Sequence, residues 1–126
     1  MPKTSSTAIA ATICALMVPM VAQAIDKSTA SQIEKLDPSD QLEQRCDLEG
    51  MDRLKADKVI SYTFSRPKHT DVHIDAKGAV FRRDGEWYRL AYSCTTSADH
   101  LSIVSFEMKP GARIAHEDWD RYYLYP

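Results

Sequence analysis

The dipeptide Asp84-Gly85 lies between two runs of alternating apolar and polar residues, and it constrains the fold more than any other feature of the sequence. Asp-Gly is a preferred two-residue loop of a β-hairpin. A loop at this position pairs Ala79 with Leu90 and Arg82 with Trp87. One face of the hairpin then collects Phe81, Tyr88, Leu90, Tyr92 and Cys94. We therefore predict that the Cys94 side chain points into the core.

A helix is predicted from Pro38 to about Ala56. Asp37 is suited to cap its first turn, and Pro38 is suited to the first helical position. Apolar or small residues recur every four positions and form one stripe: Leu42, Cys46, Gly50 and Leu54. The opposite, polar surface is expected to hold Glu43, Arg45, Asp47, Arg53 and Lys55. The stripe has to be buried against the apolar face of the hairpin, so Cys46 and Cys94 are predicted to form a disulfide between helix and sheet.

Alternation with a period of two predicts further strands at residues 59–64, 70–76 and 101–109. An aromatic tail follows, with Trp119, Tyr122, Tyr123 and Tyr125. The predicted fold class is α+β: an N-terminal helix packed on an antiparallel sheet of four to five strands, with one helix-to-sheet disulfide. Residues 37–126 are expected to form a single domain, preceded by a flexible N-terminal segment at 25–36.

The first residues have the form of a secretory signal. A short charged start is followed by an apolar stretch, and Ala22 and Ala24 provide the small residues of a cleavage site. We predict a signal peptide at 1–24 with cleavage after Ala24, and no membrane span in the mature form. An uncleaved anchor or acylation at Cys14 are the alternatives, but the apolar stretch is short for both. Cleavage also removes Cys14 and leaves one pair of cysteines, in an oxidising compartment.

Composition excludes several classes of function. The net charge is −2, so neither nucleic acid nor an anionic membrane surface is an expected partner. The sequence has no serine elbow and no glycine-rich phosphate loop, and its predicted mature part has no free cysteine. We therefore predict no catalytic residue and no cofactor, and expect that the protein is not an enzyme.

Several stretches resemble the DUF930 family of exported proteins from alphaproteobacteria. They are Leu36-Asp37-Pro38, residues 41–47 ending in Cys46-Asp47, residues 78–81 and 85–90, Cys94, Asp99, Trp119 and residues 123–126. The resemblance covers nearly all of the predicted mature chain. It implies a periplasmic or cell-envelope domain and supplies no catalytic residue.

Two surfaces are candidate sites. His69, Asp71, His73 and Asp75 alternate along one predicted strand, so they are expected to share one face, roughly 6.6 Å apart per pair. Such a set of imidazoles and carboxylates can bind zinc or a similar ion. This favours a metal-binding protein or metal-dependent hydrolase; the alternative is the solvated face of a half-buried strand.

The second candidate is the other face of the hairpin, which brings together Arg82, Trp87 and Arg89. Exposed Trp beside Arg is typical of recognition surfaces. This face favours a non-enzymatic recognition or adaptor module in the cell envelope, with an envelope protein or a glycan as partner. The alternatives are that Trp87 packs under the C-terminal tail, and that the protein has a purely structural role in the envelope.

Overall fold

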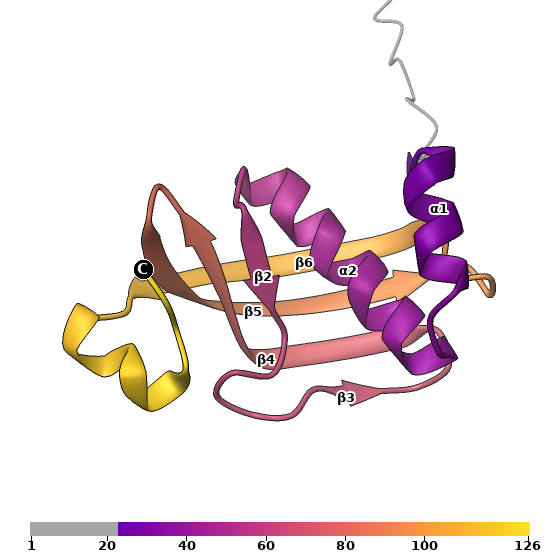
Figure 1. Ribbon diagram of the computed structural model, residues 1–126. Helices are drawn as coiled ribbons and strands as arrows, with labels where there is room; N and C mark the ends of the chain where they lie inside the picture. Colours follow the sequence, from indigo (N-terminus) through magenta and orange to yellow (C-terminus); the bar gives the residue numbers. More distant parts are fainter. Residues whose placement is uncertain (1–22) are drawn as a thin grey trace, which may run out of the picture.

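The structure, a computed structural model, describes residues 23–126 (Figure 1). The elements are β1 (Gln23–Ala24), α1 (Lys27–Glu34), α2 (Pro38–Leu54), β2 (Lys58–Ile60), β3 (Lys68–His69), β4 (His73–Arg83), β5 (Glu86–Thr96) and β6 (Ser102–Arg113). The antiparallel sheet has the order β1-β6-β5-β4-β2, and β3 also pairs with β4. The predicted α+β class is confirmed. Residues 1–22 of the predicted signal peptide, with Cys14, lie outside the described residues.

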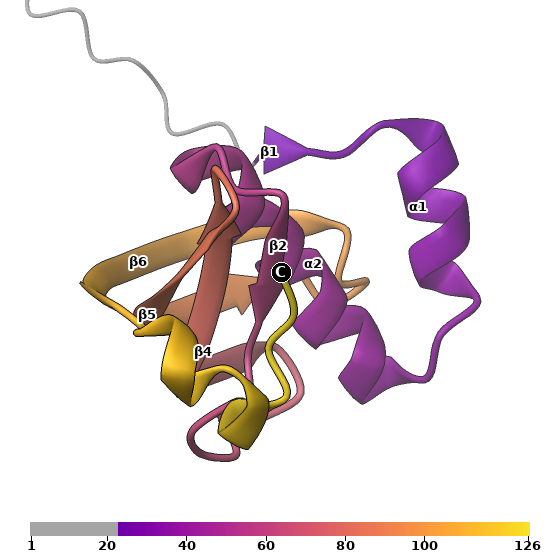
Figure 2. The ribbon, with the colours of Figure 1, turned by 60° about the vertical axis from the view of Figure 1, so that its left-hand side comes forward.

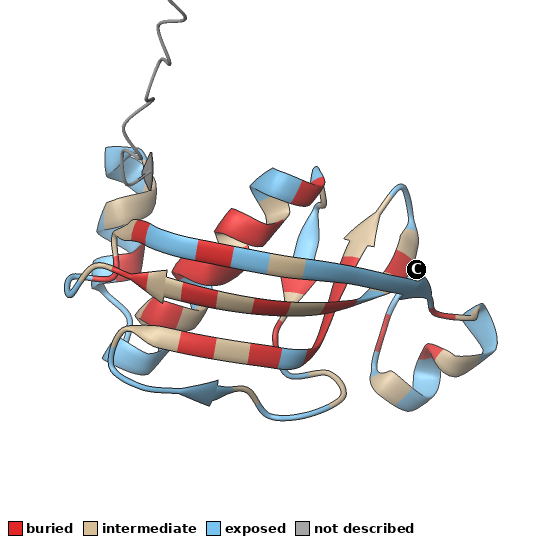
Figure 3. Ribbon diagram, turned by 180° about the vertical axis from the view of Figure 1, so that it is seen from behind, coloured by how far each residue is buried: buried red, intermediate tan, exposed pale blue. Residues whose placement is uncertain are grey.

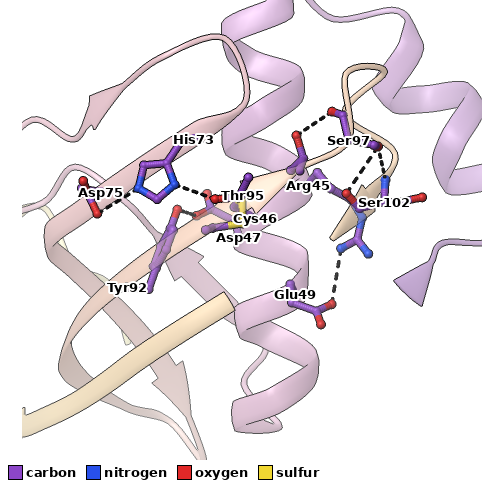
Figure 4. The surroundings of a disulfide bond; sticks show 12 residues. Arg45, Cys46, Asp47, Glu49, His73, Asp75, Tyr92, Thr95, Ser97 and Ser102 are labelled. Carbon is purple, nitrogen blue, oxygen red and sulfur yellow. Dashed lines mark hydrogen bonds and ion pairs between the residues drawn. A yellow bond between two sulfur atoms is a disulfide. The ribbon is translucent and has the colours of Figure 1, made fainter. Parts of the chain in front are cut away.

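Helix α2 packs on one face of the sheet through the predicted apolar stripe. Leu42, Cys46 and Leu54 are 1%, 0% and 6% exposed. Cys46 forms the predicted disulfide with Cys94 of β5, and the two Cα atoms are 6.1 Å apart. Figure 4 shows this bond between the helix and the strand. The core on this side of the sheet is therefore tied together by a covalent bond.

The predicted hairpin register is confirmed near the turn. Arg82 pairs with Trp87 and Ala79 pairs with Leu90. A register shift between Ala76 and Ala79 then inserts one extra residue into β4, so that Cys94 lies opposite Ile74. Alternation along β5 is unbroken, and Cys94 keeps its place on the core face.

The first predicted strand is shorter than expected. Strand β2 ends at Ile60, and the chain then leaves the sheet and crosses β4 at the register shift, where the Phe64 amide donates to the Gly78 carbonyl at 2.8 Å. Gly78 allows this crossing because a Cβ there would lie 2.3 Å from the Ser65 amide nitrogen. The crossing carries Phe64 to the face of the sheet that α2 does not cover.

Gly78→Ala is therefore expected to lower the free energy of unfolding by roughly 2 kcal/mol, because the added methyl group overlaps backbone that has to move. Urea denaturation measures this change. Gly50→Ala is the matched control, since a Cβ at that helical position meets side chains only at 3.5 Å or more. Replacing a helical glycine there should be neutral or slightly stabilising. Equal loss in both variants would contradict the close crossing at Gly78.

Two α-helices are present within residues 23–126, and the sequence predicts only the second. Residues 25–36, expected to be flexible, include α1, whose N-cap Asp26 accepts a hydrogen bond from the Thr29 amide at 2.9 Å. Ile33 of this helix is 2% exposed. In Figure 2, α2 lies between α1 and the sheet.

The polar surface of α2 is also more buried than its pattern predicts. Arg45, Asp47 and Glu49 are 2%, 8% and 3% exposed. The Arg45 guanidinium donates to the Leu101 carbonyl at 3.0 Å and contacts Glu49 at 3.4 Å (Figure 4). Asp47 accepts a hydrogen bond from the Tyr92 hydroxyl at 2.7 Å. Segments distant in sequence cover these side chains and supply polar partners. The four-residue repeat of the helix cannot predict such contacts.

The C-terminal tail forms a second core on the other face of the sheet. It turns at His116–Asp118 and Asp120–Tyr122 and lies against the β4–β5 turn end of the sheet (Figures 1 and 2). The buried residues of this second core are Val80, Trp87, Ile114, Trp119 and Leu124. The tail therefore covers one end of this face.

Within residues 23–126, no helix has the length and apolar character needed to span a membrane.

Candidate functional site

The candidate site is the part of the sheet that neither α2 nor the C-terminal tail covers. Figure 3 views the molecule from the side opposite to that of Figure 1 and shows this face, with β4, β5 and β6 in front of the helices. We call it the open sheet face. Its residues are His73, Asp75, Lys77, Arg89, Ala91, Ser93, Thr95, Glu107 and Lys109, all exposed or intermediate in burial. Along each strand these residues alternate with the residues that pack against α2, so their side chains point to the opposite face of the sheet.

Two adjoining hollows form a basic groove on the open sheet face. One has a volume of about 280 Å³ and the other about 180 Å³, and both are lined by Lys77, Ala91 and Lys109. Arg89 also lines the second hollow, with its guanidinium 3.9 Å from the centre of the Phe64 ring. We call Lys77, Arg89, Ala91 and Lys109 the basic groove. Its small floor residue, Ala91, leaves the space between the cations open.

The cations of the basic groove lack a close carboxylate partner among the described residues, although the charge of Lys77 acts on Asp75 and Glu107 lines the larger of the two hollows. Within the described chain, neither Lys77, Arg89 nor Lys109 has an ion pair, whereas Arg82 and Arg113 do. A carboxylate or phosphate would supply the missing counter-charge through charge-assisted hydrogen bonds. The groove is therefore suited to an anionic group.

Next to the basic groove lies a polar array of two cross-strand pairs. His73 pairs with Thr95 and Asp75 pairs with Ser93. His73 Nδ1 lies 2.7 Å from Thr95 Oγ1 and its Nε2 lies 3.2 Å from Asp75 Oδ1 (Figure 4). Ser93 also donates to Asp75. Hydrogen bonds from Ser93 and then from His73 lower the pKa of Asp75, so this carboxyl is ionised at neutral pH.

The array has the groups of an acid–base site, but Asp75 is shared between two donors. His73 donates to the Asp75 carboxylate through Nε2 and contacts the Thr95 hydroxyl through Nδ1. These contacts align the four side chains in a row beside the groove.

The predicted recognition residues are neighbours on one sheet face, with Arg82 paired with Trp87, but the C-terminal tail covers part of that face. Trp87 is 0% exposed, and its indole nitrogen donates to the Tyr125 carbonyl at 2.8 Å. This is the alternative in which Trp87 packs under the tail. Arg82 forms an ion pair with Asp57 at 3.0 Å. Only Arg89 lies on the open sheet face.

The predicted metal residues do not share one strand face. His69 belongs to β3, which pairs antiparallel with β4, and Asp71 lies in the connection between them. His73 and Asp75 alone remain together on β4. Within the described residues, no group of three or more His, Cys, Asp or Glu side chains is placed to hold a metal ion. The four residues are divided because the chain turns after β3, and the alternating pattern of the sequence does not reveal this turn.

A larger hollow lies at the start of α2. It has a volume of about 850 Å³ and lies among Pro38, Gln41, His69, Thr70, Asp71, Ala98 and His100. The buried His100 ring holds its walls together, with Gln41 Oε1 at 2.9 Å and the Asp71 carbonyl at 2.6 Å. These contacts join α2, the β3–β4 turn and the β5–β6 loop, so His100 serves as a structural clamp.

Comparison with known proteins decides the family. Residues 33–124 match the family described as Domain of Unknown Function (DUF930). The chain belongs to the DUF930 family. The match spans α2, the disulfide, the open sheet face and most of the tail of this DUF930 protein. Searches of curated proteins and of solved structures find no match.

Two cations of the basic groove are absent from the sequence prediction. Lys77 lies within the register shift of β4, and Lys109 lies on β6, opposite Ala91. A small residue, Ala91, on the same predicted hairpin face as Arg89 is the one signal that marks this place in the DUF930 sequence. Lys109 joins the basic groove only through the pairing of β6 with β5.

Proposed function

We propose that this DUF930 protein is an exported, non-enzymatic recognition module that binds an anionic component of the cell envelope in its basic groove. The observation that carries the proposal is the set of cations around Ala91 that have no ion-pair partner among the described residues. A single carboxylate or phosphate placed over Ala91 contacts cations from β4, β5 and β6. Contacts from separate strands fix both its position and its orientation.

The scaffold is suited to this role. The disulfide is compatible with an oxidising compartment such as the periplasm. Phe64 bounds the groove at one end, and Arg89 is held over its ring. A cation held in place loses little side-chain entropy when it binds a ligand.

Binding of the purified protein to polygalacturonate and to poly-L-glutamate, measured by calorimetric titration, tests the proposal. We expect saturable binding of at least one polyanion. The Lys77→Ala, Lys109→Ala double variant should weaken it roughly tenfold, because two charge-assisted contacts are lost. Lys35→Ala, a change of the same type outside the open sheet face, is the control and should leave the affinity unchanged.

Absence of saturable binding to either polyanion would contradict the proposal. So would equal weakening by Lys35→Ala, because the interaction would then follow net charge and not the groove. Both groove lysines are exposed. Their replacement should leave the thermal unfolding curve in place, so a loss of binding is separable from a loss of folding.

A further inference from the structure

The charge of the open sheet face changes from positive to negative within two residues along its strands. Ala91 of β5 is opposite Lys109 of β6, and the next pair on the same face is Ser93 opposite Glu107. Ser93 is also opposite Asp75 of β4. Asp75, Ser93 and Glu107 thus form an acidic row directly beside the basic groove. Two residues along a strand span about 6.7 Å, which is the separation of the two rows.

The acidic row has groups that accept hydrogen bonds. An ionised carboxylate is an acceptor only, and Glu107 has no ion pair within residues 23–126. Asp75 uses one oxygen, Oδ1, for both Ser93 and His73, which leaves Oδ2 available. The row therefore favours hydroxyl or amine donors and repels a second anion.

From these two rows we infer that the ligand is an acidic saccharide. The inference rests on the proposed anion-binding function and names the class of anion. In a uronic acid, one edge of the sugar ring presents a carboxylate and the other presents hydroxyl groups. The carboxylate binds among Lys77, Arg89 and Lys109, and the hydroxyls donate to Asp75 and Glu107. One ring contacts both rows.

An acidic peptide fits this surface less well. Its side-chain carboxylates find counter-charges in the basic groove, but its glutamates bring no hydroxyl donors to the acidic row. A carboxylate that reaches Asp75 or Glu107 meets a like charge, which is unfavourable. The two ligand classes are therefore separated by how the acidic row affects each of them.

The test compares trigalacturonate with an acetylated, amidated triglutamate peptide, which carries the same number of carboxylates. Calorimetric titration of the purified protein should give the saccharide roughly a tenfold higher affinity. Glu107→Ala should weaken saccharide binding roughly fivefold through the loss of a hydrogen bond to a charged group. The same variant should leave peptide binding unchanged or strengthen it, because a repulsive charge is removed. Asp75→Ala provides a second, independent variant of the row.

The outcomes distinguish this inference from the proposed function. Equal affinity for both ligands, or tighter binding of both to Glu107→Ala, would show that the acidic row only repels, and would overturn the saccharide assignment while anion binding stands. Binding of neither ligand to the wild-type protein would overturn both. Neutral trigalactose is a further control. Equal binding of trigalactose and trigalacturonate would contradict a role of the basic groove in binding the carboxylate.

Discussion

Replacing both Cys46 and Cys94 by alanine is expected to lower the free energy of unfolding by about 4 kcal/mol, because a long loop is no longer closed in the unfolded chain. The two residues are separated by 48 positions and are fully buried. For a domain of this size, the loss should reduce the midpoint of thermal unfolding by roughly 20 °C. The bond also holds α2 on the sheet, so its loss affects the whole core.

Urea denaturation with and without a reducing agent measures this effect. The wild-type protein should lose stability on reduction, and the double alanine variant should not respond to the reductant. A double variant within about 1 kcal/mol of the oxidised wild-type protein would contradict a major structural role for the disulfide.

Asp47→Asn is expected to stabilise the protein strongly at alkaline pH. Burial is the main cause that raises the pKa of Asp47 from 3.8 to about 8, and the nearby charge of Glu43 acts in the same direction. The hydrogen bond from Tyr92 and the charge of Lys58 oppose this shift. The folded protein therefore holds a neutral carboxyl group at neutral pH, next to the disulfide.

The pH dependence follows from the direction of this shift. Between about pH 4 and pH 8 the folded state retains a proton at Asp47 that the unfolded state has lost. Over this range the Asp47 contribution to the free energy of unfolding therefore decreases as pH rises, by about 1.4 kcal/mol per pH unit. It is fully present below pH 4 and is lost above pH 8. Asparagine keeps an acceptor for the Tyr92 hydroxyl and cannot ionise.

Chemical denaturation at a series of pH values checks this prediction. Wild-type and Asp47→Asn proteins should have similar stability near pH 4, and the variant should be more stable by several kcal/mol near pH 9. Asp52→Asn removes an exposed carboxylate from the same helix and should leave the wild-type pH profile unchanged. Parallel profiles for the wild-type and Asp47→Asn proteins would contradict a raised pKa at Asp47.

Local features of the sequence were sufficient to predict the central contacts of the fold. Asp84-Gly85 determines the hairpin register near the turn, and the four-residue repeat places Cys46 on the buried side of α2. Each depends only on residues that are close in sequence. The disulfide then follows, because these are the two apolar surfaces that must pack together.

The remaining features depend on segments that are distant in sequence. The register shift before Ala79 exists because the Phe64 segment crosses β4 at Gly78. Trp87 is buried because the tail folds back over it. The hairpin alone predicts Arg89 as a site residue, whereas Lys109 joins it only through the pairing of β5 with β6. Alternation along a single strand cannot supply these contacts.

Backbone amide chemical shifts recorded by NMR during titration with trigalacturonate test the basic groove most directly. Saturable shift changes should be largest at Lys77, Ala91 and Lys109 and should disappear in the Lys77→Ala, Lys109→Ala variant. Changes that centre instead on the hollow beside Pro38, Thr70 and His100, or no saturable change at any amide, would contradict the assignment of ligand binding to the open sheet face.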